Sequence, residues 1–183
     1  MSDEIEVLRI VAQRLATAQV EYMLTGSVAM SWYAQPRQTR DVDIVIDLPA
    51  AKINTVVDAF SADFYIDADV VRDEVKRRGM FNMIQDALVV KVDMILRKSG
   101  AHDIEAFRRR RDAEIAPGLN VRIIAPEDLI LAKLAWAAQG ESDLQIRDVR
   151  NLLVSVQELD QSYLSHWAGR LGVAELLEKA TSP

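Results

Sequence analysis

The spacing of hydrophobic residues divides the chain into a part with two periodicities and a part with one. Up to residue 125, short apolar runs that predict strands alternate with segments whose apolar residues recur every three or four positions, which predicts helices. From Pro126 onward only the helical spacing continues, over three or four segments. This order predicts an α/β (or α+β) fold, with a mixed β-sheet core over residues 1–125 and a helical part over residues 126–183 packed on it.

The individual elements follow from the same pattern and from the turn residues between them. Gly79 is expected to end a helix, and Pro117 with Gly118 to join two strands. The expected helices span residues 3–19, 28–33, 49–60, 68–78 and 103–111, and the expected strands span residues 22–25, 42–47, 80–84, 88–96, 114–116 and 121–125.

The amino-acid composition excludes several kinds of chemistry. The sequence has no cysteine and only two histidines, which excludes disulfides and a cysteine nucleophile and disfavours a zinc site. Metals that prefer hard oxygen ligands remain. Half of the residues are apolar, which is enough for a core, and the net charge of −6 argues against non-specific coating of nucleic acid.

The sequence also lacks the patterns of secreted and membrane proteins. Its first residues are acidic, without the basic and then apolar layout of a signal peptide. No apolar run approaches the length of a membrane span. We therefore expect a cytoplasmic protein with no membrane partner.

A turn between the first expected strand and the next helix has the character of a phosphate site. Gly26 allows a sharp turn and a close approach of the backbone to a ligand. The following helix offers unpaired N–H groups to an anion, and Ser27 adds a hydroxyl group. Taken alone, the two residues favour an ordinary helix cap, and only the carboxylates that follow in the sequence favour phosphate binding.

Two aspartates open the next strand, after a gap of thirteen residues from Ser27. Because side chains alternate along a strand, Asp41 and Asp43 lie on one face. Carboxylates side by side repel each other, and a divalent cation such as Mg²⁺ or Mn²⁺ relieves the repulsion. A third carboxylate, Asp93, lies within another apolar strand, where it needs a partner.

Gly26, Ser27, the thirteen-residue gap and the Asp41-x-Asp43 pair together resemble the signature of the nucleotidyltransferase fold of the DNA polymerase beta superfamily. The stretch from Pro36 to Asp43 is similar to small bacterial members, including nucleotidyltransferases of abortive-infection and toxin–antitoxin systems. The resemblance implies that residues 1–125 form a nucleotidyltransferase core. It also implies that Asp93 is the third metal ligand, although pairing with Lys91 or an arginine is the alternative.

The resemblance implies a mechanism as well. Gly26 and Ser27 would hold the terminal phosphates of a nucleoside triphosphate, while Asp41, Asp43 and Asp93 bind metal and Asp93 acts as base. The acceptor is a tRNA 3′ end, a protein hydroxyl or a small molecule such as an antibiotic, and a cognate antitoxin or toxin is a further expected partner. Two alternatives stay open: a catalytically silent nucleotide-binding, antitoxin or scaffold module, and a metal-dependent phosphohydrolase.

Further candidate residues lie in the loop before the carboxylates and in the C-terminal helices. Arg37, Thr39 and Arg40 either hold the loop or bind the triphosphate. Lys133 and Asp148 fall on apolar sides of successive helices, so they should meet each other or a ligand. The toxin-like nucleotidyltransferases have a similar lysine and later aspartate, which implies that both residues belong to the catalytic site.

Two other features of the sequence concern its basic stretches and its tryptophans. The basic stretches 76–78 and 108–111 are either solvated helix faces or contacts to RNA or polyphosphate. The tryptophans Trp32, Trp136 and Trp167 are expected to be core or helix-packing residues.

Overall fold

The computed structural model describes residues 2–35, 39–140 and 143–181. Within these ranges, seven strands form one mixed sheet in the order β3-β4-β5-β2-β1-β7-β6. The strands are β1 Glu21–Thr25, β2 Asp41–Asp47, β3 Phe64–Tyr65, β4 Met80–Gln85, β5 Val90–Leu96, β6 Arg111–Ala116 and β7 Leu119–Ile123. The helices are α1 Asp3–Thr17, α2 Gly26–Tyr33, α3 Ile53–Phe60 after a short 3₁₀ turn Ala50–Lys52, α4 Ala68–Arg77, α5 Ala101–Arg108, α6 Pro126–Gly140, α7 Asp143–Ser155, α8 Gln161–Leu171 and α9 Ala174–Thr181.

The two central strands β2 and β5 run parallel, whereas β1 pairs with β2 and β4 with β5 in antiparallel fashion. Burial alternates along β2: Val42, Ile44 and Ile46 are fully buried, and the intervening residues are half-buried. One face of these strands therefore belongs to the hydrophobic core, and the other face is free to carry polar side chains.

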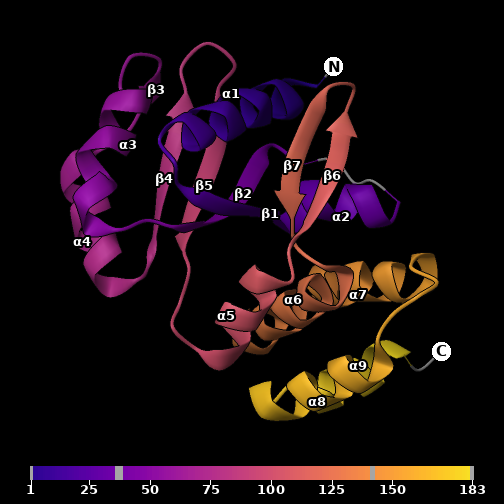
Figure 1. The fold of residues 1–183 in the computed structure, drawn as a ribbon. Helices are drawn as coiled ribbons and strands as arrows, with labels where there is room; N and C mark the ends of the chain where they lie inside the picture. The colour runs from indigo at the N-terminus through magenta and orange to yellow at the C-terminus, as the bar shows by residue number, and fades with distance from the viewer. Residues whose placement is uncertain (1, 36–38, 141–142, 182–183) are drawn as a thin grey trace.

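The helices are distributed unevenly around the sheet, as Figure 1 shows. Helix α1 lies over the middle of the sheet, in contact with β1, β2 and β5, while α3 and α4 pack together near the β3 edge. Helices α5 to α9 gather in the lower half of the view, beyond the strand ends. The mixed sheet and the helical C-terminal part are thus as the hydrophobic pattern predicts, which confirms the expected α/β fold.

The boundaries of two helices differ from the expected ones for identifiable reasons. Helix α4 ends one residue early, because Arg78 and not Gly79 takes the left-handed conformation, with φ of 51°. Gly79 instead makes room for the Glu74 carboxylate, whose Oε2 would lie 1.9 Å from a Cβ at position 79. Helix α5 ends at Arg108, because Arg111 already pairs with Ile123 at the start of β6.

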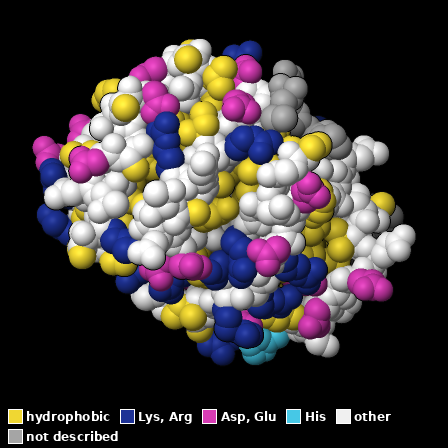
Figure 2. Space-filling view, turned by 45° about the horizontal axis from the view of Figure 1, so that its top comes forward, with side chains coloured by type: hydrophobic (Ala, Val, Ile, Leu, Met, Phe, Trp, Pro, Cys, Tyr) yellow, Lys and Arg dark blue, Asp and Glu magenta, His cyan; other side chains and the backbone are white. Residues whose placement is uncertain are grey.

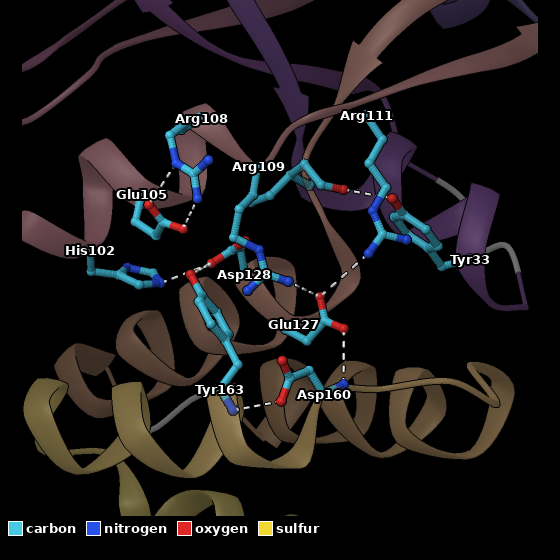
Figure 3. A network of polar contacts seen from close by, with 11 residues as sticks. Tyr33, His102, Glu105, Arg108, Arg109, Arg111, Glu127, Asp128, Asp160 and Tyr163 are labelled. Atoms are coloured by element: carbon cyan, nitrogen blue, oxygen red, sulfur yellow. Dashed lines mark hydrogen bonds and ion pairs between the residues drawn. The ribbon is translucent and has the colours of Figure 1, made fainter.

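Helix α6 begins with two buried carboxylates that connect the sheet side to the C-terminal helices (Figure 3). Glu127 Oε2 lies 2.8 Å from Arg109 Nη2, and Asp128 Oδ2 lies 3.5 Å from Arg109 Nε. Asp128 Oδ1 lies 3.1 Å from His102 Nε2 and accepts a 2.6 Å hydrogen bond from the Tyr163 hydroxyl. One cluster of polar groups therefore joins α5, α6 and α8.

The same cluster anchors the start of α8. The backbone N–H of Asp160 donates a hydrogen bond to Glu127 Oε1 at 3.1 Å. The guanidinium of Arg109 stacks 3.6 Å from the centre of the Tyr163 ring, which adds a cation–π contact.

Among the described residues, no helix is long and apolar enough to cross a membrane.

Candidate functional site

The register of the two central strands brings the predicted carboxylates together. In the parallel β2–β5 pair, Asp43 lies opposite Asp93 and Asp41 lies opposite Lys91. Side chains at paired positions point to the same face of a sheet, so Asp41, Asp43, Lys91 and Asp93 share one face. Asp93 is buried, with 8% of its surface exposed, and Asp41 and Asp43 are half-buried.

Gly26 allows the predicted phosphate turn to touch the carboxylates. Thr25 pairs with Asp43 across the β1–β2 ladder, and helix α2 begins at the next residue. Gly26 has φ of +65°, and a Cβ atom there would lie 1.9 Å from Asp43 Oδ2. Any other residue would collide with this carboxylate, because the side chain of Asp43 lies directly against the backbone at the start of α2.

The carboxylate cluster contains one lysine. Lys91 Nζ lies 2.9 Å from Asp93 Oδ2 and 3.6 Å from Asp41 Oδ2. The hydrogen bond to Asp93, followed by the charges of Asp93 and Asp41, raises the pKa of Lys91 against the opposing effect of desolvation. The sequence alternative of an Asp93–Lys91 pair is therefore present, but only one oxygen of Asp93 takes part in it.

The remaining negative charge is not fully compensated. Burial, and then the neighbouring charges of Asp93 and Asp41, raise the pKa of Asp43 above its ordinary value. Asp93 Oδ1 is buried and has no hydrogen-bond partner among the described residues. A buried polar atom without a partner is costly, and such atoms are expected where a ligand or ion belongs.

Lys133 and Asp148, predicted to meet each other or a ligand, form a buried ion pair. Lys133 Nζ lies 2.7 Å from Asp148 Oδ2 and 3.3 Å from Gln145 Oε1. Their relative exposures are 5% and 4%. The pair joins α6 to α7, and Lys133 also faces the carboxylate cavity.

A cavity of about 290 Å³ lies between the carboxylate face of the sheet and helix α6. Of the residues predicted from the sequence, its lining includes Gly26, Ser27, Thr39, Asp41, Asp43, Asp93 and Lys133. The sequence analysis missed the other lining residues, namely Thr25, Met80, Ile95, Leu129, Ala132, Trp136 and Gln145. A larger hollow of about 760 Å³ lies at the far end of β2, beside Asp47 and Arg78, and none of the predicted site residues lines it.

The predicted residues of the loop before β2 have different positions. Asp41 N donates a hydrogen bond to Thr39 Oγ1 at 3.3 Å, so Thr39 braces the entry to β2 and also lines the cavity. Arg40 is exposed and is not among the lining residues. Arg37 lies outside the described residues.

The chemical type of the donor groups fits a hard divalent cation, although the side chains that the structure describes are not arranged as a complete metal site. The described residues contain no group of three or more histidine, cysteine, aspartate or glutamate side chains arranged to hold a metal ion, and the Lys91 ammonium lies between Asp41 and Asp93. The available donors are nevertheless carboxylate oxygens, as Mg²⁺ and Mn²⁺ prefer. Asp93 Oδ1, which has no hydrogen-bond partner in the described part of the chain, belongs to the residue paired with Asp43. Asp43 and Asp93 would hold such an ion, with Asp41 as the third candidate ligand.

Two of the tryptophans, expected to be core or helix-packing residues, lie outside the core. Trp136 is 59% exposed and Trp32 is 48% exposed. Of the two, only Trp136 lines the cavity. Its position three residues after Lys133, one helical turn further along α6, is the signal in the sequence that would have placed it near the site.

The basic stretches of the sequence are largely neutralised. Figure 2 shows lysine and arginine side chains gathered in the lower part of one face, with acidic side chains among them. Ion pairs join Lys76 to Asp73, Arg77 to Glu74, Arg108 to Glu105, Arg109 to Glu127 and Arg110 to Glu21. These contacts favour solvated and structural roles for the arginines over a dedicated RNA surface.

Comparisons with solved structures relate the fold to nucleotidyltransferases. The chain is similar to an antigenic nucleotidyltransferase-like protein from Paracoccidioides brasiliensis, with 20% identity, a TM-score of 0.58, and coverage of 98% of this chain and 92% of that one. It is also similar to ANT(2")-Ia in complex with adenylyl-2"-tobramycin, with 13% identity, a TM-score of 0.57 and coverage of 98% and 99%. A third similar structure is the lincomycin-bound lincosamide antibiotic adenylyltransferase LnuA, with 12% identity, a TM-score of 0.53 and coverage of 84% and 96%.

At these identities the structural likeness establishes the fold. The comparison with curated protein sequences found no match. A family model described as "Nucleotidyl transferase AbiEii toxin, Type IV TA system" matches residues 9–155, which is most of the chain. The matched segment contains Gly26, Ser27, the three aspartates and the Lys133–Asp148 pair. The chain belongs to the AbiEii family of nucleotidyltransferase toxins.

Proposed function

We propose that this protein transfers a nucleoside monophosphate from a nucleoside triphosphate to a hydroxyl acceptor, in a reaction that depends on Mg²⁺ or Mn²⁺. The observation that supports it most is the contact between Gly26 and Asp43, which sets a helix N-terminus directly beside three carboxylates. An anion at the start of α2 and a cation among the carboxylates would be neighbours there. A triphosphate–metal complex has both charges.

Each candidate residue has a proposed role in this reaction. The N–H groups at the start of α2 and the Ser27 hydroxyl hold the terminal phosphates, with Thr39 fixing the entry to β2. Asp41, Asp43 and Asp93 hold the metal, and Asp93 accepts the proton of the attacking hydroxyl. A bound divalent ion supplies neutralisation of the phosphate charge and a lower pKa for the acceptor hydroxyl. Lys133, fixed by Asp148, adds positive charge beside the phosphates.

The acceptor and the biological setting are proposed from the family. A Type IV toxin–antitoxin family implies a cognate antitoxin as partner. Among the structural neighbours, LnuA is bound to lincomycin and ANT(2")-Ia is in complex with adenylyl-2"-tobramycin. A small molecule is therefore one acceptor class, beside a tRNA 3′ end and a protein hydroxyl. We assign the reaction to the cytoplasm, where nucleoside triphosphates are available. We also propose residues 1–125 as the catalytic core and residues 126–183 as a helical subdomain that closes it.

Pyrophosphate release tests the reaction. The protein is incubated with each nucleoside triphosphate and Mg²⁺, with and without total tRNA, and Asp43→Asn serves as the matched inactive control. Release of pyrophosphate together with label transfer to an acceptor is the expected result. Orthophosphate release without label transfer would support the phosphohydrolase alternative, and binding without turnover would support the silent module.

Metal binding is tested separately by thermal stabilisation. A ligand that binds only the folded state raises the melting temperature by mass action. Mn²⁺ is titrated into the wild type and into the double variant Asp41→Asn/Asp43→Asn, and a shift is expected in the wild type alone. Equal shifts in both proteins would remove the metal assignment.

A further inference from the structure

The cavity wall formed by α6 has an aromatic side chain that the proposed chemistry does not use. Trp136 belongs to a helix whose residues are mostly buried, yet 59% of its own surface is exposed, at the rim of the cavity. Lys133, one turn earlier and about 4.5 Å away along the helix axis, is almost fully buried in the same lining. The wall therefore changes from a buried charge to an exposed aromatic surface over a single turn.

The opposite wall changes in the same direction. Met80 and Ile95 are paired across the β4–β5 ladder and line the cavity on the sheet side. Met80 is 43% exposed, whereas Asp93, two positions before Ile95 on β5, is buried. Within the cavity lining, Asp93 and Lys133 are thus buried, whereas Met80 on the sheet side and Trp136 on the helix side present exposed apolar surface.

We propose that the base of the nucleoside triphosphate stacks on the indole of Trp136, with Met80 and Ile95 facing it from the sheet. This inference rests on the proposed function, which places the triphosphate at the charged end of the same cavity. A nucleotide matches the two ends of the cavity, because it joins a polyanion to a flat, weakly polar ring. Stacking on an aromatic side chain is open to every base, so Trp136 provides affinity and does not select among bases.

Binding of two probes separates the contribution of the base from that of the phosphates. Non-hydrolysable analogues of ATP, GTP, CTP and UTP are compared with inorganic tripolyphosphate by isothermal titration in the presence of Mg²⁺. Trp136→Leu is expected to weaken the nucleotide analogues about five- to a hundredfold, the range typical of one stacked base, and to leave tripolyphosphate unchanged. Trp136→Phe should keep most of the affinity. Trp32→Leu is the matched control, since Trp32 is also exposed but does not line the cavity.

Fluorescence gives a second and independent measure. In a Trp32→Phe/Trp167→Phe background Trp136 is the one remaining tryptophan. With selective excitation of tryptophan, the nucleotide analogues should quench its emission while tripolyphosphate does not. Equal affinities of the wild type and Trp136→Leu for every analogue would overturn the inference and leave the proposed function intact. A wild type that binds neither tripolyphosphate nor any analogue would overturn both.

Discussion

Within the residues that the structure describes, two clusters of buried or half-buried carboxylates can be compared, and their surroundings differ. Asp41, Asp43 and Asp93 lie on the sheet with one lysine, Lys91, in contact with two of them. Burial and mutual repulsion raise the pKa of Asp43, and one oxygen of Asp93 has no hydrogen-bond partner among the described residues. The charge of this cluster is left partly uncompensated.

In the second cluster, formed by Glu127 and Asp128 at the start of α6, the negative charges are matched by nearby cations. We call it the matched cluster, and the three aspartates on the sheet the unmatched cluster. Glu127 faces Arg109 and, at 3.9 Å, Arg111, while Asp128 faces Arg109, His102 and the Tyr163 hydroxyl. Asp128 Oδ2 has no hydrogen bond from the described residues, but the Arg109 guanidinium lies 3.5 Å away. The difference supports the roles proposed for them: the carboxylates with local cations would hold elements together, and the carboxylates that repel one another would bind a ligand that brings the missing charge.

The largest effect is expected from breaking the matched cluster. Asp128→Ala leaves Arg109 and the Tyr163 hydroxyl without one of their partners in a buried place, so the free energy of unfolding should fall by about 3–5 kcal/mol. Urea denaturation followed by circular dichroism measures it. A loss below about 1 kcal/mol would show that the cluster does not connect the C-terminal helices to the sheet.

A substitution in the unmatched cluster of Asp41, Asp43 and Asp93 should lower activity and not stability. Asp43→Asn is expected to lower turnover by about a hundred- to a thousandfold, the scale for one lost electrostatic contact in a transition state. Stability without metal should be unchanged or higher, because the substitution removes a repelling charge. Steady-state kinetics and urea denaturation, made on the same preparation, give both values.

The pH dependence of stability tests whether the charge of Asp43 destabilises the folded protein. Because the pKa of Asp43 is raised, this carboxyl group binds a proton more tightly in the folded state than in the unfolded state. The stability of the wild type relative to Asp43→Asn should therefore fall as pH rises from the ordinary pKa to the raised one, and then stay constant. A difference that grows in favour of the wild type with rising pH would contradict the proposed repulsion.

The Lys133–Asp148 pair is a buried ion pair, and Lys133 also lines the cavity. A double variant separates its structural contribution from its proposed contribution to turnover. Lys133→Met alone leaves Asp148 buried without its cation and should destabilise the protein. Lys133→Met/Asp148→Leu removes both charges and should recover most of that stability. Turnover should still be about a hundredfold lower, if Lys133 adds charge beside the phosphates. A stable and fully active double variant would make the pair purely structural.

The smallest effect concerns one hydrogen bond of the matched cluster. Tyr163→Phe keeps the ring beneath Arg109 but removes the O–H donor to Asp128, so the free energy of unfolding should fall by about 1.5–3 kcal/mol. Tyr65→Phe is the control, since Tyr65 is 64% exposed and its change should stay within about 0.5 kcal/mol. Similar losses in the two variants would mean that the hydroxyl of Tyr163 contributes nothing specific.

Local patterns in the sequence determined much of the fold and part of the site. Alternation along residues 41–47 and the apolar runs before Gly26 predict strands, because a half-buried strand needs a period of two. The same alternation puts Asp41 and Asp43 on one face without reference to any other segment. The α/β core, the helical C-terminal part and the carboxylate pair all follow from relations between residues that are close in sequence.

The tertiary structure decided how distant residues come together, whereas the sequence placed Asp93, Lys133 and Asp148 in one site only through a family resemblance. The β2–β5 register sets Asp93 beside Asp43 and Lys91 beside Asp41, and no spacing along the chain encodes that register. The packing of α6 brings Lys133 and Trp136 into the lining of the cavity that the carboxylates share. It also turns Glu127 and Asp128, which look like ordinary helix-start residues, into buried groups. These outcomes depend on long-range packing and on charge compensation between segments, which periodicity within a single segment does not contain.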